Sequence, residues 1–435
     1  GRLPAILLAH TCLVDVLGGD PAEPGSGDKL AIRMFLAAAE VALQPDQQRA
    51  VAALDDVHGR LDQAMRLLLA DALPHGTNAE ALLDQLQGSV EASLERIDQG
   101  QLTHLVDAMR DVSDLRERLR GGGIGRARIG LAVAPGEGVT WASQFPHNPF
   151  LVPTVVGEAV TPSFVIGLAA AGAQTTRVDR ALLVAASGQA GVKDVADVPF
   201  TPVVYVVREG TDVSDVLSSG LPIKVLMLCD AHPCDAPGDV AALAMSHPGA
   251  YAAQVSLGFP EHLANTLHAA LRHTGPALVR MHAPSPRRHG FATDATTARA
   301  ELAVRTRVFP LFRFDPAADG VFGSCLDLSG NPSEALPLSA FVDGETRFSG
   351  VDMTEGEARR SRVWRTLQEL AGEVTPFTER VRAQAEDDLR AERQAALDAQ
   401  AVSHAAAIAG LQSQMADQIH RRLLTLAGYD TPGRA

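Results

Sequence analysis

The chain has 435 residues, of which 46% are hydrophobic, 4% are aromatic and 21% are charged, and its formal net charge is −14. A chain of this length can bury a large core and is expected to form two or three structural units. Its acidic balance, with no long cluster of Lys and Arg, argues against a nucleic-acid partner bound through the phosphate backbone. No apolar run approaches the ~20 residues that a membrane span needs, so we expect no membrane partner.

The four cysteines, Cys12, Cys229, Cys234 and Cys325, are irregularly spaced and do not resemble a disulfide framework. A cytoplasmic setting is the simplest expectation. The chain begins at Gly1 without an initiator Met or a signal-peptide pattern, so we expect it to be part of a longer or trimmed product.

Residues 1–120 are predicted to be a helical block. Apolar residues recur at steps of three and four over 51–68, 82–97 and 102–119, which is typical of one buried face of a helix. Pro45, Asn78 and Gly100 are expected to separate these segments. Because the block carries no recognisable chemistry, we expect it to serve packing.

Residues 121–335, beginning at Gly121-Gly122-Gly123, are predicted to form an α/β core. Strands are expected at 128–134, 164–171, 202–207, 223–228, 251–256 and 277–282, with helices at 261–273 and 294–305. This alternation predicts βαβ units and a mostly parallel sheet. Strands as continuously apolar as "IKVLML" fit burial on both faces.

Residues 336–374 are predicted to be a connector, and residues 375–435 a long C-terminal helix and tail. Thr375-Pro376 offers a helix start, and nothing before Gly428 breaks the pattern except a tolerable Gly410. A narrow apolar stripe along the later part of this helix is typical of a helix that packs on a partner helix. An ordinary helix folded back on its own domain, after a kink near Gly410, is an equal alternative.

The stretch "LMLCDAHPCDAPGDVAALAM" at 226–245 raises the hypothesis of a metal site. Cys229, His232 and Cys234 are chemically suitable for zinc. Structural zinc sites carry paired ligands such as C-x2-C, which are missing here, so a buried strand cysteine is the favoured interpretation of Cys229. His289, in "APSPRRHG", follows a strand and two arginines, where an anion or a simple turn would each fit.

Several blocks together resemble the thiamine-diphosphate domain of the pyruvate:ferredoxin (flavodoxin) oxidoreductases. Within 220–332 these are "GLPIKVLMLCDA", "ALAMSHPGAYAAQVSLGFPEHL", "GPALVRMHAPSPRRHG", "VFPLFRFDP" and "LDLSGNP". A further block at 135–168, which includes Asn148, is similar to the family segment that begins T-G-C-S-S. The resemblance covers about 130–335 well, and it implies a thiamine-diphosphate-binding-like fold.

The resemblance also implies a reaction and partners. Members of this family decarboxylate a 2-oxoacid oxidatively with thiamine diphosphate and Mg²⁺, and they pass electrons through iron–sulfur clusters. The cofactor performs the chemistry and the protein holds it. Sites of this kind form between two such domains, so we expect a homo- or hetero-oligomer with other domains or subunits of a 2-oxoacid oxidoreductase-like complex.

The sequence departs from the family at the residues that hold the cofactor. Arg208-Glu209-Gly210 stands where the family has Gly-Asp-Gly, and an Arg there would compete with Mg²⁺. Asp230 keeps the first position of the next motif, but the loop that follows it in the family is missing. Gly136 and Glu137 fall in the T-G-C-S-S segment, and no C-x-x-C is present for a cluster.

We therefore expect a degenerate thiamine-diphosphate domain with a structural or partner-completing role, no catalytic residue and no cofactor of its own. The remnant cofactor positions are Gly136, Glu137, Asn148, Glu209, Gly210, Asp230 and His289. Two alternatives stay open. One is an active enzyme that uses Glu209, Asp212, Asp215 and Asp230 as altered ligands, and the other is a scaffold with the Cys/His metal site.

Overall fold

The computed structural model describes residues 23–72, 98–120, 127–136, 150, 152–193, 195, 197–233, 247, 249–318, 322–374 and 377–428. The chain divides into two compact units, residues 1–371 and 372–435. The second unit contains one long helix, α15 (Phe377–Leu426). Within the described residues, no helix combines the length and the hydrophobicity that crossing a membrane requires.

The first unit is built on an eight-stranded sheet with the order β2-β1-β3-β4-β6-β5-β7-β8. The strands are β1 (Gly130–Val133), β2 (Thr154–Val156), β3 (Val203–Arg208), β4 (Ile223–Cys229), β5 (Tyr251–Ser256), β6 (Ala277–His282), β7 (Phe312–Phe314) and β8 (Leu326–Asp327). The first six strands in this order are parallel, whereas β7 pairs antiparallel with both β5 and β8. The predicted α/β fold with a mostly parallel sheet is confirmed, and it is consistent with a thiamine-diphosphate-binding-like fold.

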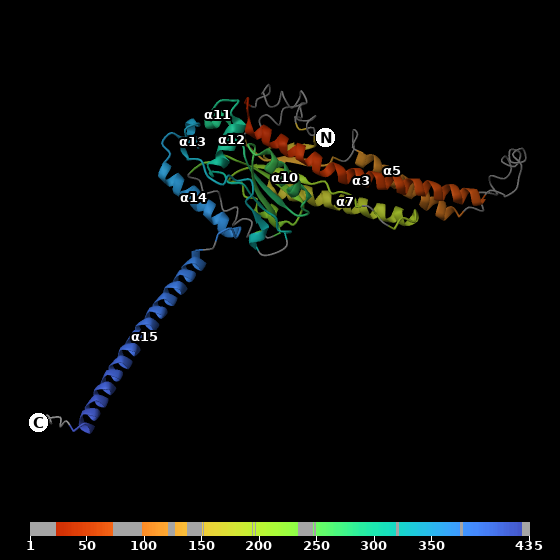
Figure 1. Ribbon diagram of the computed structural model, residues 1–435. Coiled ribbons are helices and arrows are strands. Elements are labelled where there is room, and N and C mark those ends of the chain that lie inside the picture. Colours follow the sequence, from red (N-terminus) through yellow and green to blue (C-terminus); the bar gives the residue numbers. More distant parts are fainter. Residues whose placement is uncertain are drawn as a thin grey trace, which may run out of the picture. The chain divides into compact units, whose positions relative to one another are not determined.

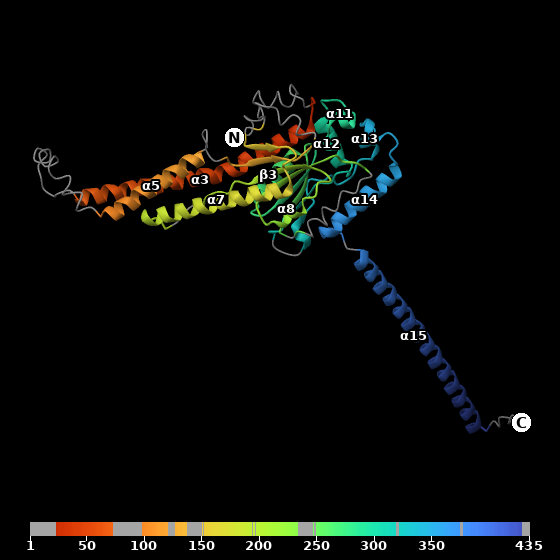
Figure 2. The same cartoon turned by 180° about the vertical axis from the view of Figure 1, so that it is seen from behind.

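Helices cover both faces of the sheet. On one face lie α3 (Gly27–Ala72) and α10 (Pro260–Arg272), which are seen in front of the sheet in Figure 1. They pack against alternate residues of the central strands. On the other face lie the first part of α7 (Pro162–Gln189), α8 (Ser214–Ser218) and α12 (Thr296–Arg305), with α7 and α8 visible in Figure 2. β3 to β6 are buried on both sides, which explains why the apolar residues of β3 and β4 do not alternate with exposed polar ones.

Three helices continue beyond the sheet as an arm. The second half of α3, α5 (Gln99–Arg120) and α7 lie side by side in Figures 1 and 2 and share a separate apolar core. Members of that core include Leu54, Leu61, Leu115 and Leu183, all at most 1% exposed. The predicted helical block is therefore two long helices where it is described, and α3 serves both the arm and the sheet.

The remaining described elements follow β6. They are α11 (Pro286–His289), the 3-10 turns η1 (Phe322–Cys325) and η2 (Thr346–Phe348), α13 (Ser339–Val342) and α14 (Met353–Leu370). Phe341 and Phe348 from this region are buried against the same face of the sheet as α7 and α8.

Some sequence predictions were wrong. Residues 164–171, predicted to be a strand, are the beginning of α7, because Thr161 caps that helix and Pro162 occupies its first position. Pro45 does not separate helices, since α3 runs through it. Gly100 is the second residue of α5, and the segment that it was expected to separate from that helix lies outside the described residues. The predicted helix at 82–97, Asn78 and Gly121 to Gly123 lie outside the described residues.

Candidate functional site

The candidate site lies where parallel strands end. Arg208 is the last residue of β3 and is paired in register with Leu228 of β4, two residues before Asp230. Cys229, the last residue of β4, is paired with His282 of β6, and α11 follows that strand closely. Parallel α/β sheets bind their ligands outside the carboxyl ends of their strands, so this edge is the place to look for a site.

The start of α3 reaches the same edge. The N–H of Gly27 donates to the carbonyl oxygen of Pro284, in the loop after β6, at 3.0 Å. A Cβ atom at Gly27 would lie 2.3 Å from that oxygen, so only glycine permits this approach. The contact places Asp28, the next residue, beside the ends of β3 and β4.

Four side chains at this edge form a closed ring of ion pairs. Arg208 donates through Nη1 to Oδ2 of Asp28 at 2.9 Å and through Nη2 to Oδ2 of Asp230 at 3.2 Å. Arg288 joins the same two carboxylates, with Nη2 at 3.0 Å from Oδ1 of Asp230 and Nη1 at 3.5 Å from Oδ2 of Asp28. We call Asp28, Arg208, Asp230 and Arg288 the strand-edge cluster. Its two acids and two arginines sum to zero charge.

Burial gives the two carboxylates of the cluster different properties. Asp28 is 5% exposed, its Oδ1 has no hydrogen-bond partner, and burial raises its pKa further than the charges of Arg208 and Arg288 lower it. Burial acts on Asp230 in the same direction. There, however, hydrogen bonding from His289 and the charges of the two arginines outweigh it, so the pKa of Asp230 lies far below its usual range. Asp230 is therefore the stable anion of the cluster.

His289, the last residue of α11, contacts the strand-edge cluster at Asp230. The N–H of Ser285 donates to its Nδ1 at 3.3 Å, and its Nε2 lies 3.3 Å from Oδ1 of Asp230. The imidazole ring of His289 stacks on the imidazole ring of His282, with centroids 6.3 Å apart. His282 is fully buried, and burial lowers its pKa to about 3, so it is neutral near pH 7.

Glu209 lies on the opposite face of the sheet from Arg208, because successive residues of a strand point to opposite sides. It forms an ion pair with Arg280 of β6, and Arg280 also donates to Oε1 of Gln254 at 2.7 Å. Gly210 follows with φ +92°, a turn conformation that favours glycine. Two predicted cofactor positions are thus engaged in a separate polar contact and a turn.

The hypothetical metal site is only partly described. Cys229 is buried, its Sγ is 3.5 Å from the carbonyl oxygen of Met227, and burial raises the pKa of its thiol to about 12. His232 packs edge-on against Phe348, with centroids 5.2 Å apart. Cys234 lies outside the described residues, within which no group of three His, Cys, Asp or Glu side chains has an arrangement suited to a metal ion.

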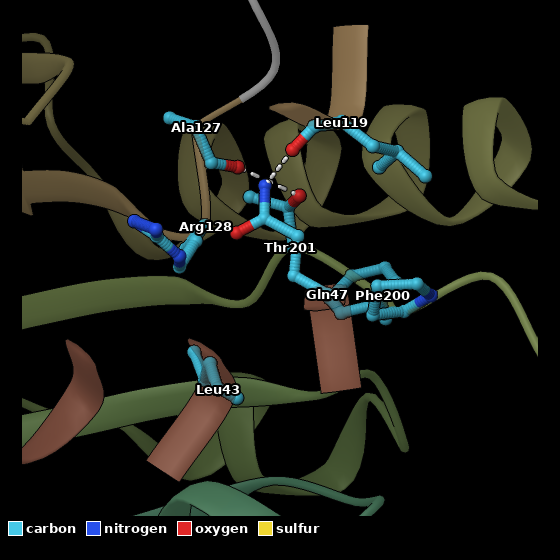
Figure 3. A pocket seen from close by; sticks show the side chains of 8 residues that line it. Leu43, Gln47, Leu119, Ala127, Arg128, Phe200 and Thr201 are labelled. Atoms are coloured by element: carbon cyan, nitrogen blue, oxygen red, sulfur yellow. Dashed lines mark hydrogen bonds between the residues drawn. The ribbon is translucent and has the colours of Figure 1, made fainter. Parts of the chain in front are cut away.

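A small pocket lies at the other edge of the sheet, where β1 and β3 begin (Figure 3). It is lined by Leu43, Gln47, Leu119, Ala127, Arg128, Pro199, Phe200 and Thr201. Its polar side chains are already engaged: Gln47 donates to the carbonyl oxygen of Leu119, Thr201 donates to that of Ala127 at 3.0 Å, and Arg128 pairs with Glu40. We therefore place the candidate site at the carboxyl edge.

Several of the predicted positions meet at the carboxyl edge. Asp230 and His289 contact each other, and a Cβ atom at Gly136 would lie 3.7 Å from Cδ of Arg208. Glu137 and Asn148 lie outside the described residues. Asp28 was missed, because it is 180 positions from Arg208 and stands in "GSGDKL", where no local pattern marks it.

Known proteins share part of this sequence. The ketoisovalerate oxidoreductase subunit VorB of Pyrococcus horikoshii is 29% identical over 132 residues, which are 30% of this chain and 41% of VorB. Part of the chain is thus similar to 2-oxoacid oxidoreductases. The pyruvate synthase subunit PorB of Methanosarcina barkeri is 31% identical over 115 residues, 26% of this chain and 36% of PorB. The pyruvate-flavodoxin oxidoreductase of Rhodospirillum rubrum is 29% identical over 147 residues, 31% of this chain and 12% of that protein.

The relationship confirms the family resemblance read from the sequence blocks. It is partial, because the chain spans less than half the length of each of these relatives. No protein-family model matches the chain. VorB and PorB are named as subunits, so this chain is related to components of larger enzymes.

Proposed function

We propose that this chain is a component of a 2-oxoacid:ferredoxin oxidoreductase-like assembly and keeps the thiamine-diphosphate-type fold without a cofactor site of its own. The observation that carries the proposal is the position of Arg208, whose guanidinium joins Asp28 and Asp230 at the carboxyl edge of the sheet. Its role is to stabilise the assembly or to complete the pocket of an intact partner domain. Thiamine diphosphate, Mg²⁺ and iron–sulfur clusters then belong to other parts of that assembly.

The residues at this edge do not fit a magnesium–diphosphate group. Mg²⁺ takes oxygen ligands at about 2.0–2.1 Å in near-octahedral geometry. Here Oδ2 of Asp28 and both carboxylate oxygens of Asp230 already accept hydrogen bonds from arginines. A guanidinium stays charged at every pH that the fold tolerates. A magnesium ion would therefore have to displace two permanent cations.

The cluster does not suit the diphosphate either. Phosphate groups are held by an excess of positive charge or by free backbone N–H groups. In the strand-edge cluster each positive charge is matched by an acid, so its net charge is zero. Binding a diphosphate would leave Asp28 as a buried anion without its arginine, which is costly.

The alternative with altered ligands has little geometric support. Glu209 faces the other side of the sheet and pairs with Arg280. Asp212 accepts a hydrogen bond from the N–H of Ser214 at 2.9 Å, at the start of α8. Both acids are committed to contacts that stabilise the fold, which leaves Asp215 and Asp230 of the four alternative ligands.

Calorimetric titration of the full chain with thiamine diphosphate and Mg²⁺ tests the absence of a cofactor site. We expect no saturable heat, and no rise in stability when both ligands are present in large excess. A ligand at 100 times its Kd would stabilise the folded state by about 2.7 kcal/mol, so thermal unfolding provides a second measurement. Micromolar, Mg²⁺-dependent binding that is lost in Asp230→Asn would overturn the proposal in favour of an active enzyme.

Native mass spectrometry of the endogenous assembly tests the partner role. We expect this chain in a defined complex with a subunit whose sequence carries Gly-Asp-Gly and C-x-x-C motifs. A complex made only of this chain that still decarboxylates a 2-oxoacid would contradict the proposal.

A further inference from the structure

The second unit presents an apolar stripe along the last part of α15. Its members are Leu397, Ile408, Leu411, Met415, Ile419, Leu423 and Leu426, and we call them the α15 stripe. Each of these side chains is between 51% and 79% exposed. At ~100° per residue, all seven lie within an arc of ~120° on the helix surface. A continuous exposed stripe of this kind marks an interaction surface.

The two parts of α15 differ in charge. Near its beginning the helix is supported by its own ion pairs, such as Arg390 with Asp387 at 2.9 Å and with Glu386 at 3.6 Å. Between Asp398 and Arg421 the only Asp, Glu, Lys or Arg is Asp417. The stripe therefore runs through a segment with few charges to solvate it, as expected for a helix that packs on another.

Side-chain size changes along the stripe and suggests what covers it. Ala401, His404 and Ala405 fall in the same arc between Leu397 and Ile408, so two positions of this part are small, whereas the stripe members from Ile408 onward are large. From this asymmetry we propose that the α15 stripe pairs with the α15 stripe of a second copy of the chain, in antiparallel orientation.

An antiparallel pair brings the two alanine positions of each stripe against large residues of the other. With Leu397 opposite Leu423 of the second copy, Ala401 lies opposite Ile419 and Ala405 opposite Met415. Large side chains then fill the space left by small ones, as close packing requires. A parallel pair would place alanine against alanine at positions 401 and 405 and leave gaps in these two layers.

Charge favours the same orientation. Arg422 falls within the arc of the stripe, so a parallel pair would place two copies of this residue side by side, which is repulsive. In the antiparallel register, Arg422 of one copy lies at the level of Asp398 of the other. The stripe is thus complementary to itself in both size and charge when one copy is reversed.

Photo-cross-linking of the full chain tests this pairing. A p-benzoylphenylalanine placed at Gln394, on the flank of the stripe, lies at the level of Leu426 of the second copy in the proposed register. Irradiation is expected to give an adduct of twice the chain mass, joined within about one helical turn of Leu426. The adduct is expected to contain one copy from each of two isotopically distinct preparations.

Two double variants provide the matched comparison. Leu411→Asp with Met415→Asp places charges in the stripe, and we expect the adduct yield to fall about tenfold or more. Ala406→Asp with Ser413→Asp adds the same charges on the opposite side of α15, where the yield is expected to stay unchanged. Far-UV circular dichroism checks that both variants keep the helix.

Three results would overturn the pairing. An adduct joined near Gln394 of the second copy would indicate a parallel pair. A cross-link within one chain would indicate a helix folded back on the first unit. The absence of any adduct would indicate that no second copy covers the stripe. The outcome is independent of the thiamine diphosphate titration, because the stripe lies wholly within the second unit.

Discussion

Replacing Arg208 by methionine tests the strand-edge cluster directly. The change keeps most of the length of the side chain and removes its charge and its hydrogen bonds to Asp28 and Asp230. Of the described ion pairs of Asp28, only the one with Arg288, at 3.5 Å, then remains. Its Oδ1 already has no hydrogen-bond partner. A buried carboxylate left in this state destabilises the fold.

The magnitude follows from the burial of the partners. Removing one partner of a fully buried ion pair costs about 3–5 kcal/mol. Asp28 is buried, but the side chain of Arg208 is 26% exposed and that of Asp230 is 35% exposed, so solvent screens part of the loss. We therefore expect Arg208→Met to lower the free energy of unfolding by about 2–3 kcal/mol at pH 7.

The loss is expected to depend on pH. Burial raises the pKa of Asp28 above its ordinary value of 3.8, and removal of Arg208 raises it further. An acid whose pKa is higher in the folded state opposes folding above that pKa, and the opposition disappears as the pH falls through it. The difference between wild type and Arg208→Met is therefore largest near neutral pH and shrinks as the pH approaches 4.

Urea unfolding followed by circular dichroism at pH 7.5 and pH 4.5 measures both effects. Arg313→Met is the matched control, since Arg313 pairs with Asp327 at 2.6 Å but both side chains are at least 35% exposed, and a loss below about 1 kcal/mol is expected. Equal losses in the two variants, or a loss in Arg208→Met that does not change with pH, would refute the account of the cluster.

Three further predictions concern other buried features. Burial lowers the pKa of Lys224 to about 7, so the unfolded state binds this proton more tightly than the folded state does. The free energy of unfolding should therefore rise from pH 7 to pH 9 more steeply in wild type than in Lys224→Met. Parallel plots of this free energy against pH in the two proteins would contradict the prediction. Gly290→Ala should lower the free energy of unfolding, measured by thermal unfolding, by about 2 kcal/mol or more, because φ is +74° and a Cβ would lie 1.8 Å from Oγ1 of Thr346. The control Gly220→Ala, at φ +66°, meets no neighbour and should lower it by about 1 kcal/mol. Because burial raises the pKa of the Cys229 thiol to about 12, mass spectrometry should find it unmodified by iodoacetamide at pH 8 until urea unfolds the chain.

The central sheet was predictable because its strands are buried on both faces. The stretch "VLMLC" in β4 is continuously apolar and is followed by Asp230, which distinguishes it from an amphipathic helix. The same criterion failed at 164–171, where an apolar run belongs to α7 and Thr161-Pro162 decided its conformation. The short strands β7 and β8 were missed because β7 pairs with the distant strand β5 and β8 pairs only with β7 among the described strands.

The sequence predicted which residues meet at the site only where they follow the end of a parallel strand. Asp230 and His289 each follow a strand closely, so their meeting at one edge follows from a parallel sheet. Glu209 was grouped with them, but strand alternation directs it to the opposite face. Asp28 reaches the edge through the contact of Gly27 with Pro284, which no local pattern in the sequence indicates.

If the cofactor has been lost, the cluster explains how the fold tolerates the loss. A bound cofactor stabilises the folded state that holds it, so its loss removes stabilisation and leaves polar strand ends without partners. The strand-edge cluster joins the start of α3, the ends of β3 and β4 and the helix α11, which are the segments that surround this edge. Restoring the family motif with Arg208→Gly and Glu209→Asp should therefore lower the free energy of unfolding without restoring thiamine diphosphate binding, because Arg288 would still hold Asp28 and Asp230. Recovery of Mg²⁺-dependent binding in that double variant would mean that Arg208 alone closes the site.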